Sequence, residues 1–199
     1  MPPTAATRPA RERLLAAAAE LFYESGIAAT GVDAVLRRAG VSPATMYAHF
    51  AGKDALVAAY LERRHDQWRA VWDEILAERS DPRDRLLSVF DAVARFRARS
   101  DSRRGCGFLA AAAELPPAHP GRHWLAADTA LLTGRLADLA RDAGAPRPAD
   151  LAAELLLLYD GALAGQARNA TVPGSAGPDP LGRARAAARA LLTSRLGGR

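Results

Sequence analysis

Residues 30–53 read TGVDAVLRRAGVSPATMYAHFAGK, the most informative part of the sequence. Apolar residues recur in it at helical spacing and predict one helix over 31–39 and a second, very short helix over 43–49. Gly40 ends the first helix, because glycine takes the left-handed conformation without strain. Ser42 is a typical helix cap, and the proline that follows it suits the first helical position. Two short helices joined by so tight a turn predict a helix-turn-helix unit.

The apolar pattern gives this unit an inner and an outer face. The inner face is predicted to hold Val32, Val35, Leu36, Ala39, Val41, Met46 and Phe50. The second helix then turns Ala44, Thr45, Tyr47, Ala48 and His49 outward. A face that is small and polar at its N-terminal end suits a helix lying in the major groove of DNA. The pattern therefore predicts a DNA-reading helix.

The outward side chains have chemistry that suits DNA. Ala44 lets the backbone approach closely, while Thr45 can offer its hydroxyl to a base edge and its methyl group to a thymine methyl. Tyr47, His49 and Lys53 can reach phosphates on either side. Tyr47 and His49 have an alternative interpretation as ordinary surface residues of a short helix. The predicted DNA-contacting set is Thr30, Ser42, Ala44, Thr45, Tyr47, His49 and Lys53.

Three residues near the first helix also have two interpretations each. Thr30 followed by Asp33 resembles a capping box, with Asp in place of Glu or Gln. At that helix start, the Thr30 hydroxyl and the free N–H groups can also face a phosphate. Arg37 and Arg38 are either a solvated charge pair or additional DNA contacts.

The composition narrows the class of protein. The chain has 199 residues, 49% of them hydrophobic and 25% charged, with a net charge of +5. Cys106 is the only cysteine, which excludes an internal disulfide and a cysteine-based zinc cluster and favours a reducing cytoplasm. No apolar stretch approaches the roughly 18 to 20 residues of a spanning helix. We therefore expect no membrane partner.

The remaining sequence also reads as helices, because no segment shows convincing strand alternation. The predicted fold class is all-α. Further helices are predicted over 9–24, 53–79, 82–100, 104–115, 123–143, 148–169 and 181–196, with a loop rich in proline and glycine over 171–180.

Residues 8–64 resemble the DNA-binding region of the tetracycline-repressor (TetR) family of transcriptional regulators. The matching pieces are Leu21-Phe22…Gly26, Thr30-Gly31-Val32, Ala39-Gly40-Val41-Ser42, Thr45-Met46-Tyr47, His49-Phe50 and Lys53-Asp54-Ala55-Leu56. The resemblance implies a nine-helix fold, with a helix-turn-helix domain over 1–52 and a helical ligand-sensing and dimerisation domain over 53–199.

The resemblance also implies how the protein works. A member of this family is expected to bind a palindromic operator in double-stranded DNA as a homodimer, usually as a repressor that a small molecule releases. It is expected in the cytoplasm, on the nucleoid. An N-terminal arm of the kind formed by Arg8, Arg11 and Arg13 can reach DNA in this family.

The C-terminal helices carry the predicted dimer interface. The run over 155–159 is apolar on every side, and a helix of that kind must be buried all round. The helix that carries this run and the helix over 181–196, from each of two chains, would form a four-helix bundle with twofold symmetry. The alternative is that the apolar run forms the core of one chain. The predicted interface residues are Leu155, Leu157, Leu158, Gly161, Gly165, Leu181, Ala184, Ala188, Leu191 and Leu192.

The bulky residues of the middle helices are the candidates for a sensing pocket. Ligand pockets are largely apolar with a few polar groups, so we expect a small apolar or aromatic effector, although aromatic residues at helical spacing are also typical of plain core. The predicted ligand-contacting set is Trp68, Trp72, Phe90, Phe108, Trp124, Tyr159 and Cys106.

Parts of the sequence also leave three other functions open. Cys106 could sense oxidants or electrophiles if Arg103 and Arg104 lowered its thiol pKa; the alternative is an inert buried thiol. A Cys–His enzyme would need Cys106 paired with His119 or His123, and a scaffold protein would have lost DNA binding. We expect no enzyme, no cofactor and no metal, because no catalytic motif is present and Pro120 interrupts the histidine pair.

Overall fold

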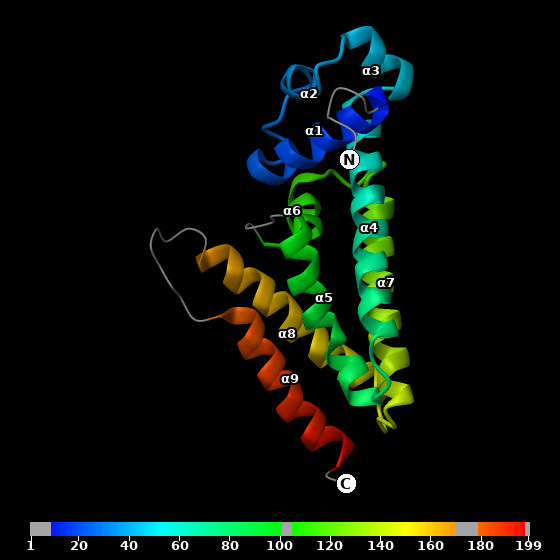
Figure 1. Ribbon diagram of the computed structural model, residues 1–199, viewed down its shortest axis with the longest axis vertical. Helices are drawn as coiled ribbons and strands as arrows, with labels where there is room; N and C mark the ends of the chain where they lie inside the picture. The colour runs from blue at the N-terminus through cyan, green and yellow to red at the C-terminus, as the bar shows by residue number, and fades with distance from the viewer. Residues whose placement is uncertain (1–8, 101–104, 170–178, 198–199) are drawn as a thin grey trace. The chain divides into compact units, whose positions relative to one another are not determined.

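The computed structural model of the chain describes residues 9–100, 105–169 and 179–197. Within these ranges the chain forms helices and no strand (Figure 1), so the predicted all-α class is confirmed. The helices are α1 (Ala10–Ser25), α2 (Val32–Ala39), α3 (Pro43–His49), α4 (Lys53–Ala77), α5 (Pro82–Ser100), α6 (Gly107–Glu114), α7 (Arg122–Asp142), α8 (Pro148–Asn169) and α9 (Pro180–Leu196).

The predicted boundaries agree with these bounds to within three residues. The largest difference is at α6, which starts at Gly107 rather than at residue 104, and α4 ends at Ala77 rather than at residue 79. Residues 104 and 171–178 of the predicted helix and loop lie outside the described residues.

The described chain packs into two compact units. The first contains the residues up to His65 together with Gly107–Ala127, and the second contains Asp66–Cys106 and the residues from Asp128 onward. The first unit therefore holds α1, α2, α3, the start of α4, all of α6 and the first turns of α7. This grouping differs from the predicted functional division at residues 52 and 53, which stays a prediction.

The first unit has its own apolar core. The inward face of α1 is buried at Leu14, Ala17, Ala18 and Phe22, and α1 packs against both α2 and α3. The Phe22 ring meets the Tyr60 ring of α4 edge to face, with centroids 5.6 Å apart, an arrangement that aromatic pairs prefer. This core fixes the two short helices on the longer ones.

The second unit is built around two tryptophans of α4. Trp72 is fully buried, its indole N–H donates to the Ser88 hydroxyl at 2.9 Å, and the Arg135 guanidinium lies 4.8 Å from its ring centroid. The Trp68 ring contacts the rings of Trp72, Phe96 and Tyr159. Helices α4, α5, α7, α8 and α9 all contribute to this core.

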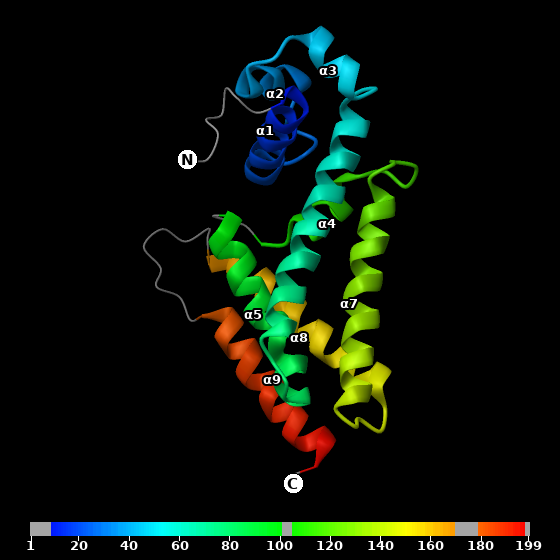
Figure 2. The ribbon, with the colours of Figure 1, turned by 45° about the vertical axis from the view of Figure 1, so that its right-hand side comes forward.

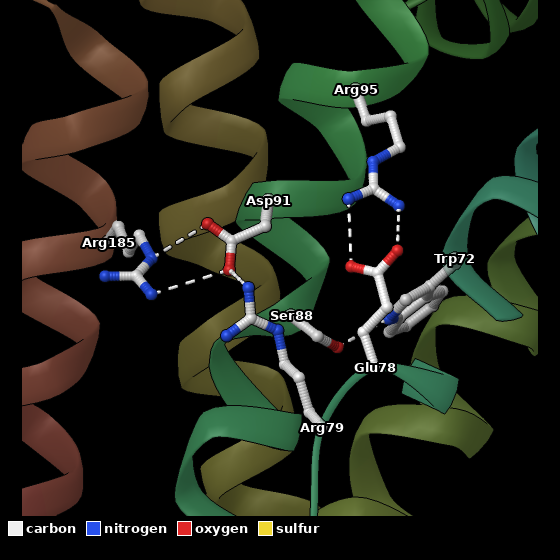
Figure 3. A network of polar contacts seen from close by, with 7 residues as sticks. All are labelled: Trp72, Glu78, Arg79, Ser88, Asp91, Arg95 and Arg185. Atoms are coloured by element: carbon white, nitrogen blue, oxygen red, sulfur yellow. Dashed lines mark hydrogen bonds and ion pairs between the residues drawn. The ribbon is translucent and has the colours of Figure 1, made fainter. Parts of the chain in front are cut away.

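A network of charged groups joins three parts of the second unit (Figure 3). Asp91 of α5 accepts from Arg79, which follows α4, at 2.8 Å and from Arg185 of α9 at 3.0 Å. Glu78 and Arg95 form a two-pronged pair with contacts of 2.6 and 2.9 Å. The network ties α5 to the end of α4 on one side and to α9 on the other.

Helices α8 and α9 run antiparallel and lie side by side in both views (Figures 1 and 2). They approach each other closely at Gly165, where an added Cβ would lie 2.9 Å from the Pro180 Cβ. Asp179 caps α9 by accepting from the backbone N–H groups of Leu181 and Gly182, and Arg195 of α9 pairs with Glu154 of α8.

Candidate nucleic-acid interface

The second helix of the helix-turn-helix unit begins as the sequence predicts. The Ser42 hydroxyl accepts from the Thr45 backbone N–H at 3.2 Å, and Pro43 is the first helical residue. The Ser42 and Thr45 hydroxyls also lie 2.9 Å apart. The cap therefore fixes both the start of α3 and the position of the Thr45 side chain.

The turn between α2 and α3 is closed by backbone conformation and by a distant side chain. Gly40 has φ 61° and ψ 45°, the left-handed conformation that the sequence predicts. The Arg13 guanidinium of α1 donates to the Gly40 carbonyl at 3.1 Å. Sequence reasoning missed this contact, because residues 27 positions apart on different helices leave no periodic signal.

The inner face predicted for α2 and α3 is confirmed. Val35, Leu36, Ala39, Met46 and Phe50 are buried, and Val32 and Val41 are half-buried. Residues of α3 on the opposite face are open to solvent: Ala44, Tyr47, Ala48 and His49 are exposed, with 61% of Tyr47 accessible, and Thr45 is half-buried. Helix α3 therefore presents these five side chains to solvent, while its apolar side faces the core of the first unit.

Thr30 differs from its prediction. The N-cap of α2 is Gly31, with no side-chain capping hydrogen bond, so the capping-box prediction is wrong. Thr30 is 4% exposed, and its hydroxyl lies 2.7 Å from the Gly26 carbonyl and 3.2 Å from that of Leu21. The hydroxyl thus closes the turn before α2 and faces inward, and its predicted phosphate contact stays untested.

Lys53 is the first residue of α4 and is half-buried. Its ammonium group lies 3.5 Å from the Ala28 carbonyl. Asp54 beside it is exposed, and its carboxylate lies 3.4 Å from Nε2 of the buried His119. Since Nδ1 of His119 accepts from the Gly121 backbone N–H at 2.9 Å, this ring spans the turn before α7 and the start of α4.

The other predicted cations of the first unit have structural contacts. Arg38 pairs with Glu20 at 2.6 Å, and hydrogen bonding to that carboxylate raises the pKa of the exposed Arg38 guanidinium. The Arg11 guanidinium lies 5.5 Å from the Phe50 ring centroid. Arg37 is exposed. Arg8, the remaining member of the predicted arm, lies outside the described residues.

The predicted dimer residues divide into two groups. Leu155, Gly165, Ala184, Ala188 and Leu192 are buried within the single chain, where they pack α8 and α9 onto each other and onto the core, and their part in an intersubunit surface stays a prediction. Leu157 is 73% exposed, Gly161 is exposed, and Leu158, Leu181 and Leu191 are half-buried. The single chain alone does not cover α8 on every side, so burial all round would need a second copy and stays a prediction.

The predicted ligand contacts also divide. Trp68, Trp72, Phe90 and Tyr159 are core residues of the second unit. Phe108 and Trp124 belong to the first unit: Phe108 is buried in α6, and the half-buried Trp124 ring contacts those of His65 and His123. The set therefore does not form one cluster within one compact unit, and ligand contact by its members stays a prediction.

The alternative sites gain no support from the described chain. Cys106 is half-buried and packs against the core of the second unit, while Arg103 and Arg104 lie outside the described residues. Among residues 9–100, 105–169 and 179–197, no three His, Cys, Asp or Glu side chains converge as a metal site would require. Over the same residues, no helix is both long and apolar enough to cross a bilayer.

Comparisons with known proteins agree with the helix-turn-helix structure of the first unit. Residues 14–60 match the model of the family described as bacterial regulatory proteins, tetR family. The transcriptional activator FasR of Mycolicibacterium smegmatis is 38% identical over 82 residues, which are 41% of this chain and 37% of FasR. The chain thus spans little more than a third of that curated relative.

Solved structures match nearly the whole chain. SCO4454, a TetR-family transcriptional regulator from Streptomyces coelicolor, is 28% identical with a TM-score of 0.82, covering 94% of this chain and 96% of that one. A TetR-type transcriptional regulator from Streptomyces avermitilis is 34% identical with a TM-score of 0.68, covering 92% and 99% of the two chains. Both structures are of TetR-type transcriptional regulators. With its exposed recognition helix and a full-length relative above 30% identity, the chain belongs to the TetR family of DNA-binding transcriptional regulators.

Proposed function

We propose that the chain represses transcription by binding a palindromic operator as a homodimer, and that a small apolar or aromatic ligand releases it. The observation that carries the DNA part is the exposed face of α3, where Ala44, Tyr47 and His49 surround the capped Thr45. A short helix with small and polar residues at its start suits the major groove. Base edges are read there by side chains such as Thr45.

Phosphate contacts would hold this helix in place. Tyr47 and His49 are exposed near the end of α3, and Lys53 begins the next helix. Ser42, the N-cap of the same helix, is also exposed. Because contacts of this kind release counterions, neutralising roughly six to ten phosphates per dimer would lower affinity about a thousandfold or more between 50 and 200 mM salt.

The proposed dimer rests on the face of α8 that the rest of the chain leaves exposed. Exposed residues on this helix recur as Ala153, Leu157, Gly161, Ala164 and Arg168, a helical stripe with Leu157 at its centre. An added Cβ at Gly161 would meet nothing within 4 Å in this chain, so another backbone can approach closely there. Two copies of this stripe form a self-complementary contact of the kind twofold dimers use.

The release part rests on the composition of the second unit. A ligand shifts the protein away from DNA only if it binds the DNA-incompetent state better than the competent one. The Trp68, Phe96 and Tyr159 rings meet in the core of this unit and would suit an aromatic ligand. A coupling of about 1 to 3 kcal/mol gives a 5- to 150-fold release.

The experiment is fluorescence anisotropy with the palindromic DNA nearest the protein's own gene and with a scrambled duplex of equal length. The expected result is tight binding to the palindrome only, with two chains per site. Lys53→Ala should weaken binding to both duplexes alike, whereas Thr45→Ala should change the preferred base. Equal affinity for the palindrome and its scrambled control would refute specific binding.

The sign of regulation and the release are tested separately. FasR is named an activator, so a reporter driven by the bound promoter must distinguish the two modes: repression predicts higher output when the regulator is deleted. For release, hydrophobic and aromatic compounds are titrated against the protein–DNA complex. If none changes the anisotropy, the proposed ligand response is wrong while DNA binding stands.

A further inference from the structure

The first compact unit, which contains the residues up to His65 and Gly107–Ala127, holds α2 and α3 and is called the DNA-reading unit. Helix α6 is packed as a part of it. At its N-terminal end, an added Cβ on Gly107 would lie 2.8 Å from Nε of Arg64, and the guanidinium of Arg64 lies 5.3 Å from the centroid of the Tyr23 ring of α1. At its C-terminal end, Arg122 donates to the carbonyls of Ala112, Leu115 and Pro116. The helix is thus held at both ends by residues of α4 and α7 from the same unit.

The last residue of α6 contacts the turn that leads into α2. The Glu114 carboxylate accepts from the Ala28 backbone N–H at 2.6 Å, across 86 positions of sequence. It also lies close to Gly26, where an added Cβ would be 3.2 Å from Oε1. Gly26 has φ +92°, a conformation that other residues rarely adopt. Glycine therefore serves both the backbone path and the approach of the carboxylate.

Ala28 lies at the centre of a small group of contacts. Its N–H meets Glu114, and its carbonyl lies 3.5 Å from the ammonium group of Lys53. Two residues later, the buried Thr30 hydroxyl closes the same turn onto the Gly26 carbonyl at 2.7 Å. Ile27 anchors the turn in the core, with 6% of its surface accessible. The turn is therefore held by α6, by the start of α4 and by its own threonine.

We propose that Glu114 is a positioning residue for DNA binding: it holds the turn of residues 26–31 and, through it, the start of α2 and the ammonium group of Lys53. The inference rests on the proposed use of α3 and Lys53 to bind DNA. Glu114 itself does not contact DNA. It acts because its side-chain oxygen accepts from the Ala28 N–H and so holds the turn in place, and because the turn precedes the two short helices directly.

The hydrogen bond and the charge of Glu114 make opposite contributions. A carboxylate near a phosphate-binding surface repels DNA, whereas the bond to Ala28 orders the surface that binds it. Glu114→Gln keeps an oxygen that can accept from Ala28 and removes the charge, and Glu114→Ala removes both. If the hydrogen bond is what matters, the glutamine variant keeps full affinity and the alanine variant loses it.

The experiment measures two quantities on the full-length chain with the palindromic DNA. The first is amide hydrogen exchange at Ala28, which reports the contact without DNA. The second is DNA affinity by anisotropy. Glu114→Ala is expected to remove protection at Ala28 and to weaken DNA binding roughly two- to tenfold, the loss that one hydrogen bond of ordinary net strength implies. Glu114→Gln is expected to keep the protection and to bind at least as tightly as the wild type.

The matched control is Glu62→Ala, since Glu62 of α4 has no hydrogen bond or ion pair among the residues that the structure describes; it should change neither quantity. Glu114→Asp, whose side chain is one methylene shorter, is the substitute if the alanine variant fails to fold, and it should show the same losses.

Unchanged DNA affinity in a folded variant that has lost Ala28 protection would overturn the proposal. So would an Ala28 amide that exchanges freely in the wild type. Failure of the wild type to bind DNA would refute the proposed function instead.

Discussion

Arg185 of α9 and Arg79 beyond α4 share the carboxylate of Asp91, which lies between them in α5. The three groups come from distant parts of the sequence and are only about a quarter to a third exposed, with 26% of the Asp91 side chain accessible. A carboxylate with two cationic partners forms a network, and networks contribute more than single surface pairs do. Asp91 therefore connects α9 to the residues that directly follow α4, within the second unit.

Asp91→Ala is expected to lower the free energy of unfolding by about 1 to 3 kcal/mol, because it leaves two half-buried guanidinium groups without their shared partner. In a chain of this size each kcal/mol corresponds to a fall in Tm of about 2 to 4 °C. Differential scanning calorimetry provides the measurement. Asp138→Ala is the control, since Asp138 pairs with Arg141 on the open surface and its loss should change Tm very little. Equal shifts for the two variants would contradict the network.

Ser88→Ala tests the polar contact inside the second core. The substitution leaves the buried Trp72 indole N–H without its acceptor at 2.9 Å, and an unsatisfied buried donor costs about 1 to 3 kcal/mol. The measurement is the midpoint of urea unfolding, followed by tryptophan fluorescence. Ser194→Ala, at an exposed position of α9, should leave the midpoint unchanged. A Ser88→Ala midpoint equal to that of the wild type would show that the indole has another partner.

Leu157→Arg and Leu155→Ala separate dimerisation from folding. Leu157 is 73% exposed in the single chain, so an arginine there should keep the helical fold and convert dimers into monomers. Leu155 is fully buried, and its truncation should cost about 2 to 5 kcal/mol of stability. Sedimentation velocity and thermal unfolding measure the two effects. A Leu157→Arg protein that remains dimeric would place the interface elsewhere.

Asp160 gives a pH dependence to the stability. Burial raises the pKa of its carboxyl above the ordinary value of 3.8, so the folded state disfavours the charged form. The resulting loss of folding stability is absent below pH 3.8, where both states are protonated. It grows as the pH rises from 3.8 to the elevated pKa of the folded state, and it is complete above that pKa. Asp160→Asn is therefore expected to raise Tm at pH 7 and to give no advantage below pH 3.8. Asp142→Asn, at an exposed position, serves as the control; an advantage of Asp160→Asn that persisted in acid would contradict the assignment.

The parts of this fold that the sequence predicts are those governed by local physics. Ser42 and Pro43 mark the start of α3, and Gly40 marks the end of α2. Both signals are visible in the sequence because caps and left-handed turns depend on residues next to one another. The exposed face of α3 follows in the same way from periodicity. The capping role predicted for Thr30 is wrong for the complementary reason: its hydroxyl bonds to carbonyls of the preceding turn, and a capping pattern in the sequence cannot show that competition.

The contacts between distant segments are the parts that the sequence does not reveal. Nothing in the local pattern around Glu114 marks it as the partner of Ala28, and nothing around Arg13 marks it as the partner of Gly40. The run of leucines in α8 is ambiguous for a related reason. Hydrophobicity predicts burial, but whether Leu155 or Leu157 faces the chain's own core depends on where α9 and α5 pack.

The DNA-reading unit is assembled from two separate stretches of chain, and this limits how specificity can be transferred between regulators. A chimera spliced at one junction near residue 52 or 65 carries α1, α2 and α3 but takes α6 from the other parent. The turn before α2 then faces a foreign residue where Glu114 stood. An exchange with two junctions, which also moves Gly107–Ala127, transfers the recognition helix together with the side chains that hold it in register.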